Sequence, residues 1–486
     1  MATILIVGAG VAGLTAGITA QLAGHQAVIY ERHFRAGGNL TGWDRKGYHI
    51  DNCIHWLTGT NQVTDFYQMW ERLGVLGNGI GLHCPEGLYT FEKNGKKLSL
   101  YREIERLERE MLALSPADKK EIRSLIHAVR SMQRLNDMGG KACARKSNVA
   151  EKLLAVPDLL KYYKCSVGDL SAQFKDPFVS EFLKCFFPVH FSALALIMVF
   201  ATFTGGNGDI PRGASCAMAD RMVERFTSLG GKLQLATGVS QICVQDGRAD
   251  ALVLDDGTSV KGDYVIVTAD PAVAFGTLLD RTYMPPKLAA QYGDPNMIRF
   301  SALHCAFSLD APKPPFRGDV VIEIPAEHRA VLCGEYLMLR EFSHEPSFAP
   351  EGKSVVQTMI YCLEQDTKAL VALRQDREAY AARKQQIADA VQSIICARMP
   401  ALQGKIACID TWTPATYARF VGSEVGSFMS FIMPAGAPPV QMSGEIPGLS
   451  NVLLATQWQM APGGLPIAAR AGIAAVELIK KAEKNK

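Results

Sequence analysis

The pattern of apolar and polar positions predicts that the chain opens with a strand, a turn and a helix. Residues 3–7 form an uncharged, β-branched run that is typical of a buried parallel strand. The glycine-rich residues 8–13 follow at once, and the apolar periodicity of residues 14–22 predicts a helix. A second apolar strand, residues 27–30, ends at Glu31. Strand, glycine turn and helix in this order are the fingerprint of a dinucleotide-binding fold.

Each glycine of this fingerprint has its own physical role. Gly8 permits the tight turn, Gly10 lets the backbone approach a pyrophosphate, and Gly13 lets the helix pack closely on the strand. The helix then presents free N–H groups and a partial positive charge to the phosphates. Glu31 stands 23 residues after Gly8, the usual place for a carboxylate that accepts hydrogen bonds from the adenosine ribose.

Later apolar runs predict that the chain returns twice to this first domain. The elements predicted in these returns are a strand at 231–243, a tight turn at 245–248, strands at 251–254, 264–267 and 451–455, and a final helix at 467–479. Between the returns, residues 302–309 and 354–362 are predicted strands of an inserted region.

We therefore predict an α/β protein of two interleaved domains. The nucleotide domain is discontinuous and consists of residues 1–64, 205–288 and 421–486, and the α+β substrate domain consists of residues 65–204 and 289–420. A chain of 486 residues is long enough for this division.

One segment leaves open whether the chain crosses a membrane. Residues 185–204 contain no formal charge when His190 is neutral, and twenty residues are long enough to span a bilayer. Three features favour a buried helix beside a ligand tunnel instead. Pro188 stands near the start of the segment, Ser and Thr residues lower its hydrophobicity, and the sequence has no second segment of this kind.

Composition narrows the class of protein. The net charge of +3 is too small to indicate nucleic-acid binding. The twelve cysteines contain no CxxC pair and no metal-ligand spacing, so we expect reduced thiols and no metal site. The first apolar stretch is the nucleotide-binding strand rather than a secretion signal, which favours a cytoplasmic location.

Basic residues are concentrated in one region. Residues 93–164 hold 17 Lys and Arg against 9 Asp and Glu, mostly on predicted helices at 104–114 and 117–135. A solvated helical face is one interpretation. The other is a patch that meets anionic lipid, which would place the protein peripherally at the inner face of a membrane.

Five further motifs follow the fingerprint along the chain. They are the doublet 37–39, residues 47–56 with His55 and Trp56, residues 211–213 and 230–231 before Val239, residues 413–427, and Gln457–Trp458 with 463–466. In this order they resemble the phytoene desaturase-like and retinol saturase-like flavoproteins of the amine-oxidase superfamily. The resemblance covers nearly the whole chain.

The resemblance implies FAD as cofactor, in a Rossmann-type domain of the GR2-like, amine-oxidase and phytoene-desaturase type. It assigns cofactor contacts to the glycine doublet, to the segment under the flavin, to the adenine-binding strand and to the closing motif. With the fingerprint residues, the expected cofactor-binding set is Gly8, Gly10, Val11, Ala12, Gly13, Glu31, Arg32, Gly37, Gly38, Asn39, His55, Trp56, Val239, Gln457, Trp458, Gly464, Leu465 and Pro466.

Few residues are candidates for assisting the flavin. His55 is the expected catalytic residue, because its segment should lie beside the ring and histidine titrates near neutral pH. The alternative is a structural core histidine. Tyr417 and Arg419 are expected to bind a polar end of the substrate, unless they brace the domain interface.

The apolar residues 186–203 suggest a long dry tunnel, which favours a lipophilic substrate. We therefore expect an FAD-dependent oxidoreductase that desaturates, saturates or isomerises carbon–carbon bonds of a polyene, a retinoid or carotenoid, or a long acyl chain. An amine or amino-acid oxidase and a non-catalytic flavin-binding protein are the alternatives. The electron partner and the direction of electron flow stay open.

Overall fold

The computed structural model describes residues 1–77, 79–135, 149–437 and 440–485. A five-stranded parallel sheet has β1 (Thr3–Val7) at its centre. Its strand order is β10 (Lys232–Gln234), β2 (Gln26–Tyr30), β1, β14 (Tyr264–Val267) and β20 (Val452–Leu454). Three distant parts of the chain therefore supply strands to one sheet. The exact boundaries of the two domains remain a prediction from the sequence.

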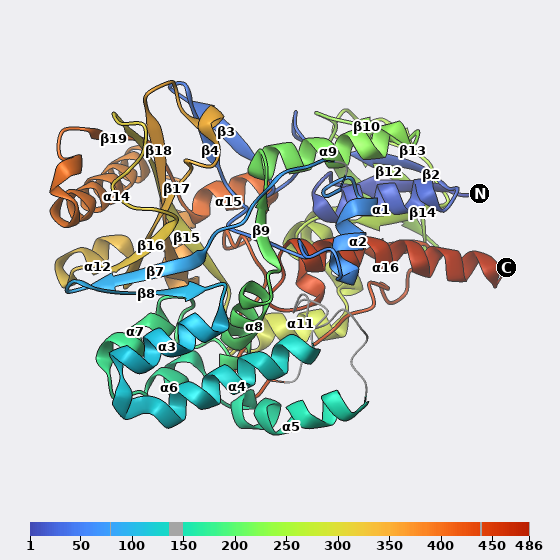
Figure 1. Cartoon of the computed structure of the whole chain (residues 1–486). Coiled ribbons are helices and arrows are strands. Elements are labelled where there is room, and N and C mark those ends of the chain that lie inside the picture. The colour runs from blue at the N-terminus through green and yellow to red at the C-terminus, as the bar shows by residue number, and fades with distance from the viewer. Residues whose placement is uncertain (78, 136–148, 438–439, 486) are drawn as a thin grey trace.

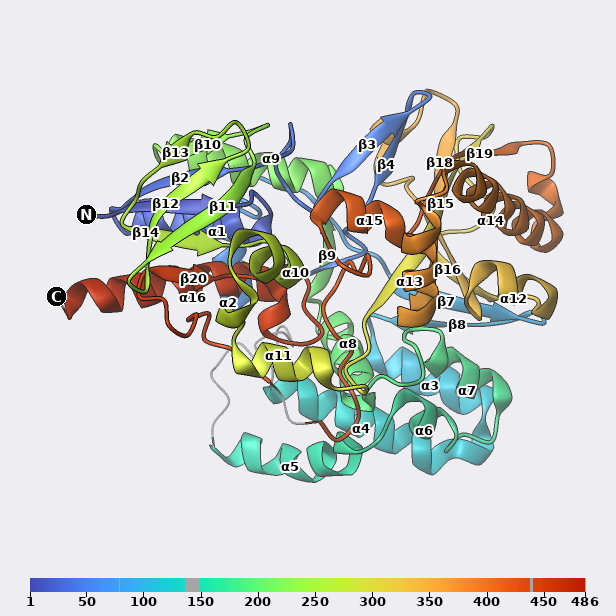
Figure 2. The ribbon, with the colours of Figure 1, turned by 180° about the vertical axis from the view of Figure 1, so that it is seen from behind.

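Both faces of this sheet are buried. Ile4 and Ile6 belong to one apolar core and Leu5 and Val7 to another, because successive side chains of a strand point to opposite faces. Helices α1 (Val11–Leu22), α9 (Ala214–Ser228) and α16 (Leu465–Lys484) cover the first face, and an antiparallel meander covers the second (Figures 1 and 2). The meander consists of β11 (Val239–Gln245), β12 (Arg248–Leu254) and β13 (Ser259–Val260).

The predicted single strand at 231–243 is wrong. The chain forms β10 and β11 in two different sheets, joined by a turn in which Ala236 has a positive φ of 51°. The turn is held by Ala236 N–H donating to His33 O and by Thr237 N–H donating to Glu31 O, at 2.8 Å each. This tertiary contact with the end of β2 breaks a run that is continuous by propensity alone.

A seven-stranded sheet forms the other half of the molecule (Figure 1). In order, its strands are β19 (Ile406–Trp412), β15 (Phe300–Leu309), β18 (Ser354–Leu363), β17 (Tyr336–Glu341), β16 (Asp319–Glu323), β7 (Gly87–Lys93) and β8 (Lys96–Tyr101). The predicted strands at 302–309 and 354–362 are confirmed as the antiparallel neighbours β15 and β18.

Helices cover both faces of this second sheet. On one face are α12 (Ala326–Leu332) and α14 (Arg377–Arg398). On the other lies a helical layer. Helix α13 (Glu364–Leu373) contributes Leu370 to the same core as α12 and α14, and α15 (Pro414–Val421) lies between the two halves of the molecule (Figure 2). The layer consists of α3 (Ile104–Leu114), α4 (Lys119–Leu135), α5 (Val149–Tyr163), α6 (Val167–Ser171), α7 (Pro177–Lys184) and α8 (Ala193–Thr204).

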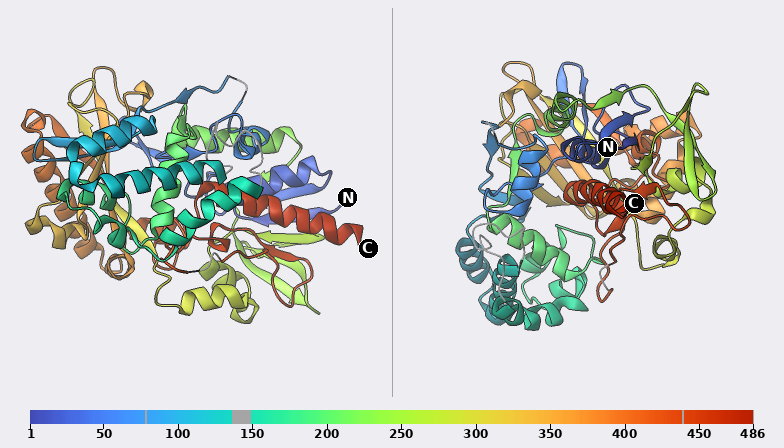
Figure 3. Two further views of the ribbon diagram at one scale, coloured as in Figure 1. Left: turned by 60° about the horizontal axis from the view of Figure 1, so that its bottom comes forward. Right: turned by 90° about the vertical axis from the view of Figure 1, so that its right-hand side faces the viewer.

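Short elements connect the two halves, and both termini lie at the end of the molecule that carries the parallel sheet (Figure 3). The connecting strands are β3 (Gly42–Arg45), β4 (Tyr48–Asp51), β5 (Leu57–Thr58), β6 (Leu82–His83) and β9 (Gly208–Pro211). The remaining helices are α2 (Asp65–Arg72), α10 (Pro271–Val273) and α11 (Pro286–Gly293).

The apolar segment 185–204 is not one continuous helix. Helix α7 ends at Lys184, an irregular segment follows, and α8 begins after Ser192, whose hydroxyl accepts a hydrogen bond from Leu194 N–H at 3.2 Å. Most of α8 is buried in the core of the helical layer. Among the residues that the structure describes, no helix has the length and hydropathy that crossing a bilayer requires. The expected buried helix is confirmed for residues 193–204 of this segment.

Candidate active site

A single large cavity of about 1030 Å³ runs from the glycine turns of the parallel sheet to the side chains of α8, β15 and β18. This volume is at the upper end of the range of about 300–1,000 Å³ found for small-molecule pockets. Every residue of the expected cofactor-binding set lines this cavity except Gly13. The motifs that the sequence spreads over more than 450 residues therefore meet in one place.

The three fingerprint glycines are required for three different reasons. Gly8 has a φ of +103°, and an added Cβ would come within 2.7 Å of Thr268 Oγ1. At Gly13 an added Cβ would lie 1.9 Å from Gly8 O, so this glycine serves helix packing and not the cavity. At Gly10 a Cβ would meet the protein only at 3.9 Å and beyond. Protein packing thus does not require glycine at position 10. A ligand lying against the cavity wall would require it, because a side chain there would occupy the space of the ligand.

The adenosine end of the site gathers around Glu31. Its carboxylate accepts from Ala9 N–H at 2.8 Å and from His33 N–H at 2.9 Å, so it also holds the glycine turn in place. Arg32 donates to Phe420 O at 2.7 Å, and Val239 lines the same part of the cavity at the start of β11. Each Glu31 oxygen keeps a second lone pair that is able to accept a ribose hydroxyl.

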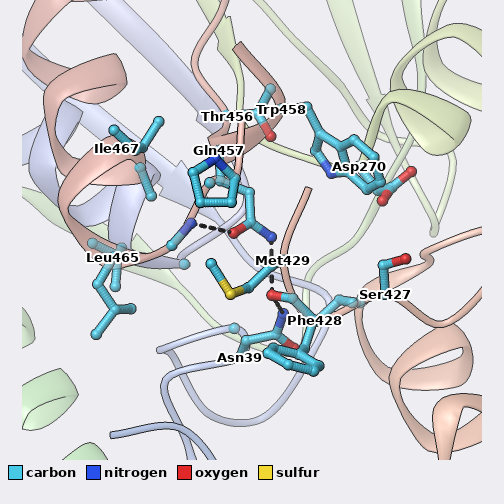
Figure 4. A pocket seen from close by; sticks show the side chains of 18 of the residues that line it. Asn39, Asp270, Ser427, Phe428, Met429, Thr456, Gln457, Trp458, Leu465 and Ile467 are labelled. Atoms are coloured by element: carbon cyan, nitrogen blue, oxygen red, sulfur yellow. Dashed lines mark hydrogen bonds between the residues drawn. The ribbon is translucent and has the colours of Figure 1, made fainter. Parts of the chain in front are cut away.

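Hydrogen bonds lock the closing motif against the glycine doublet (Figure 4). Gly464 N–H donates to Gln457 Oε1 at 2.9 Å, and Gln457 Nε2 donates to Phe428 O at 3.2 Å. Asn39 Nδ2 reaches the same Phe428 oxygen at 3.4 Å. Leu465 and Pro466 then open α16, whose N-terminal turn faces the cavity. Gln457 therefore has a structural role in shaping this wall.

Unpartnered polar atoms show that the site fits a bound FAD. Asn39 Oδ1, His55 Nδ1 and Ser427 Oγ are buried, line the cavity and have no hydrogen-bond partner in the described chain. Buried polar atoms normally have partners, so a polar ligand is the physical explanation. Helix α1 also begins without a capping side chain or an acidic residue in its first turn, which suits an anionic pyrophosphate.

The environment of His55 changes its expected chemistry. Burial, and then the charge of Arg340, holds the pKa of His55 well below its ordinary value of 6.5. The sequence argument relied on titration near neutral pH, whereas the lowered pKa favours a neutral imidazole here. His55 is a neutral imidazole with a free Nδ1 at the cavity wall, so it offers one fixed polar atom rather than a switchable charge.

The two residues expected to bind substrate, Tyr417 and Arg419, lie in different environments. Tyr417 lies on the inner side of α15, lines the cavity and is 4 % exposed. Arg419 lies two residues later on the exposed side of the same helix and does not line the cavity. A helix turns by about 100° per residue, so these positions point in opposite directions. A substrate contact for Arg419 does not fit this placement.

Sequence reasoning missed several polar residues of the cavity, among them Asn52, His304 and Asp270. Asn52 and His304 both contact Tyr417, and Asp270 lies beside Trp458 (Figure 4). Burial raises the pKa of the Asp270 carboxyl to about 7. His304 carried only the weak signal of one histidine within an apolar strand. The signal of Asp270 was equally weak, an acidic residue three positions after the end of a buried strand.

Comparison with known proteins agrees with this geometry. The family model "flavin containing amine oxidoreductase" matches residues 11–480, and the chain belongs to this family. It is 21% identical to the chloroplastic prolycopene isomerase of Daucus carota over 89% of this chain and 72% of that protein. It is 24% identical to a neurosporene-forming phytoene desaturase of Rhodobacter capsulatus over 57% of this chain and 54% of that protein.

A solved structure of putrescine oxidase bound to putrescine shares the fold, with a TM-score of 0.62 and 14% identity over 99% of each chain. The protein is thus an FAD-containing oxidoreductase with carotenoid desaturase-like relatives. The expected fold class, family resemblance and cofactor are confirmed.

Proposed function

We propose that this protein uses FAD to desaturate, saturate or isomerise carbon–carbon bonds of a long polyene. One observation carries the proposal. Among the described residues that line the cavity from 65–204 and 289–420, none is Asp, Glu, Lys or Arg. The wall there is built instead from apolar side chains: Phe187, Phe191, Leu194, Met198, Val199, Phe300 and Met359.

Charge in the cavity comes from the nucleotide end. Among the lining residues that the structure describes, the charged ones are Glu31, Arg32, Asp255 and Asp270. An amine oxidase must bind a cationic or amino-acid substrate, and burying such a charge without a partner is costly. A hydrocarbon chain has no such requirement. The names of the carotenoid-acting relatives support the same substrate class.

Bound FAD supplies hydride exchange, and the protein supplies orientation and a dry environment. Gln457 and Asn39 fix the closing motif on the glycine doublet, which sets where a flavin ring rests. Phe428, Met429 and Leu465 add apolar surface around that position (Figure 4). Beside this apolar wall, buried polar groups such as His55 Nδ1 lie in a low-dielectric environment.

The test is anaerobic mixing of the purified FAD-loaded protein with phytoene or prolycopene in detergent micelles. We expect either bleaching of the flavin absorbance or, with flavin reduced beforehand, conversion of the polyene seen by chromatography. Putrescine serves as the matched challenge for amine oxidation. Bleaching by putrescine alone would contradict the proposal, and inertness toward all three compounds would favour a non-catalytic flavin protein.

We further propose that the protein takes its substrate from a membrane surface through α5. Leu154 and Leu160 on this helix are 66% and 70% exposed, and Tyr163 at its end lines the cavity. Part of the basic region 93–164 is engaged in ion pairs, such as Lys93 with Glu181 at 2.9 Å. Exposed leucine side chains on a helix whose end lines the cavity are accommodated better by acyl chains than by water.

Sedimentation with liposomes tests this access route. We expect wild-type protein to sediment with anionic liposomes and the Leu154→Ser/Leu160→Ser variant to stay in the supernatant. Lys119→Gln/Lys120→Gln on α4 is the control for a purely electrostatic contact. Equal sedimentation of wild type and the leucine variant would contradict a role for α5.

A further inference from the structure

A buried polar triad of Asn52, Tyr417 and His304 lies in the cavity wall, and two backbone carbonyls orient its outer members. Asn52 Nδ2 donates to Asn39 O at 3.2 Å, which turns Asn52 Oδ1 toward the Tyr417 hydroxyl at 3.0 Å. On the other side, His304 Nδ1 lies 3.1 Å from Thr358 O. A carbonyl oxygen only accepts, so this nitrogen carries the proton of the imidazole.

The second ring nitrogen of His304 therefore presents a lone pair to Tyr417. His304 Nε2 lies 3.1 Å from the Tyr417 hydroxyl oxygen. The imidazole is neutral, because burial lowers the pKa of His304 to about 3 and nearby Arg340 acts in the same direction. Trp412 stacks on the ring at 4.7 Å with an interplanar angle of 5°, which favours this orientation of the ring plane.

The triad is consequently one proton short. The Tyr417 hydroxyl faces two acceptors, Asn52 Oδ1 and His304 Nε2, and has one proton to donate. Asn52 cannot relieve this by exchanging its amide atoms, because its oxygen would then face Asn39 O. One additional proton would satisfy every contact: His304 Nε2 would donate to Tyr417, and Tyr417 would donate to Asn52.

We propose that this triad accepts the proton that the substrate loses, with Tyr417 as the catalytic residue and His304 as the residue that stores the proton. The proposal rests on the proposed function. Tyr417 is suited to it because its side chain is buried and lines the same cavity. The ring of Phe428, whose carbonyl accepts from Gln457 of the closing motif, has its centroid 5.9 Å from that of Tyr417.

The step balances in atoms and charge. In desaturation, bound FAD would supply the hydride acceptor, and loss of hydride from one substrate carbon would leave a positive charge delocalised on the polyene. The neighbouring C–H bond then breaks, its electron pair forms the new double bond, and its proton moves to the Tyr417 oxygen. The Tyr417 proton passes at the same time to His304 Nε2. The positive charge thus moves from the polyene to an imidazolium that donates to Thr358 O and Tyr417.

A weak base is sufficient for this step. Burial keeps the pKa of Tyr417 above its ordinary value, so the residue does not ionise by itself. A C–H bond beside a carbocation is strongly acidic, however, and an oriented neutral acceptor is enough to remove its proton. Saturation would run the same proton path in reverse, from His304 through Tyr417 to carbon.

Two substitutions separate proton transfer from positioning. Tyr417→Phe removes the proton-transferring oxygen and keeps the ring. His304→Gln keeps a side-chain oxygen that accepts from Tyr417 but is unable to store a proton. Tyr380→Phe is the matched control, because Tyr380 hydrogen-bonds Thr413, the N-cap of the same helix α15, at 2.8 Å outside the cavity.

The experiment measures single-turnover conversion of phytoene or prolycopene, polyene affinity from flavin spectral shifts, and FAD content. For Tyr417→Phe and His304→Gln we expect the rate to fall about a hundredfold or more, as is typical for loss of acid–base catalysis, with affinity and FAD content changed by less than about threefold. Tyr380→Phe should keep the wild-type rate.

Three results would overturn the inference. A Tyr417→Phe rate near that of wild type would exclude the tyrosine, and a normal rate in His304→Gln would show that His304 only positions it. Loss of FAD or of affinity in proportion to the rate would indicate a structural role. If wild-type protein converts neither polyene, the proposed function fails as well, which distinguishes that failure from a failure of the triad alone.

Discussion

The centre of the nucleotide end of the cavity comes from one contiguous segment, whereas the polar groups of the substrate end are side chains of distant segments. Gly8, Gly10 and Glu31 lie within 24 residues, and their backbone and carboxylate contacts follow from one βαβ unit. The triad at the other end combines residues 52, 304 and 417, which lie in three separate parts of the chain. A nucleotide site needs backbone N–H groups and glycines, while a substrate site needs particular side chains.

The difference also appears in charge. The nucleotide end concentrates the charged lining residues, and the substrate end relies on neutral polar atoms inside an apolar wall. Burial lowers the pKa of both His55 and His304, so neither imidazole carries charge at neutral pH. Variants directed at one end should therefore leave the other end intact, and five substitutions test this separation.

The largest effect is expected at Gly10. In Gly10→Val the added side chain would point into the space that the cofactor needs, since the protein itself leaves Cβ room there. FAD content after purification should fall to near zero, with an unchanged far-ultraviolet circular dichroism spectrum. Gly293→Val is the control, because Gly293 lies in open space outside the cavity. A folded Gly10→Val variant with full FAD content would contradict the nucleotide assignment.

The reciprocal change is Met198→Lys at the substrate end. Met198 lies on α8 and lines the cavity, and an ammonium group there would be buried without a carboxylate. Polyene affinity should fall by at least about a hundredfold, because an unpaired buried charge costs several kcal/mol. FAD content should stay at the wild-type level. Met198→Leu conserves volume and should shift affinity less than about threefold; an equally large loss there would point to shape rather than charge.

A smaller effect is expected for Glu31→Ala. The carboxylate accepts from Ala9 N–H, and loss of hydrogen bonds to a charged group costs about 1.5–3 kcal/mol. The Kd for FAD, measured by fluorescence titration of the apoprotein, should rise about tenfold to about a hundredfold. An unchanged Kd would show that the ribose lies elsewhere.

The Asp270 carboxyl should make apoprotein stability depend on pH. Burial raises its pKa from 3.8 to about 7, so between these values the folded state binds more protons than the unfolded state. Stability from this group is then complete below about pH 4 and is lost as pH rises through about 7, by up to about 4 kcal/mol. Denaturant titrations should show this slope in wild type and lose it in Asp270→Asn. Parallel pH profiles for the two proteins would be the contrary result.

The smallest effect is expected at Cys53. Burial and the neighbouring Asp51 raise the pKa of this thiol to about 12, so a reactive thiolate is disfavoured beside the flavin position. FAD should be released by acid precipitation from both wild type and Cys53→Ser, in equal amounts. A yellow pellet from wild type that Cys53→Ser abolishes would show covalent attachment through this residue.

Much of the fold follows from local patterns. The β1 strand, α1, the turn at 245–248 and the strands β15 and β18 were predictable, because each has its own periodicity or turn residues. The split of 231–243 into β10 and β11 was not predictable, since the contact that breaks it comes from residues 31 and 33. The position at which α7 ends, just before the apolar segment, was also not predictable, because it is set by packing in the helical layer.

The sequence by itself determined the nucleotide site and its cofactor class, because glycine conformations and helix N-termini are local properties. Only the tertiary structure decided which polar groups face the substrate. It brought Asn52 and His304 to Tyr417, turned Arg419 away from the cavity, and lowered the pKa of His55 through burial beside Arg340. Burial, tautomer and hydrogen-bond direction depend on neighbours far along the chain, so no local pattern encodes them.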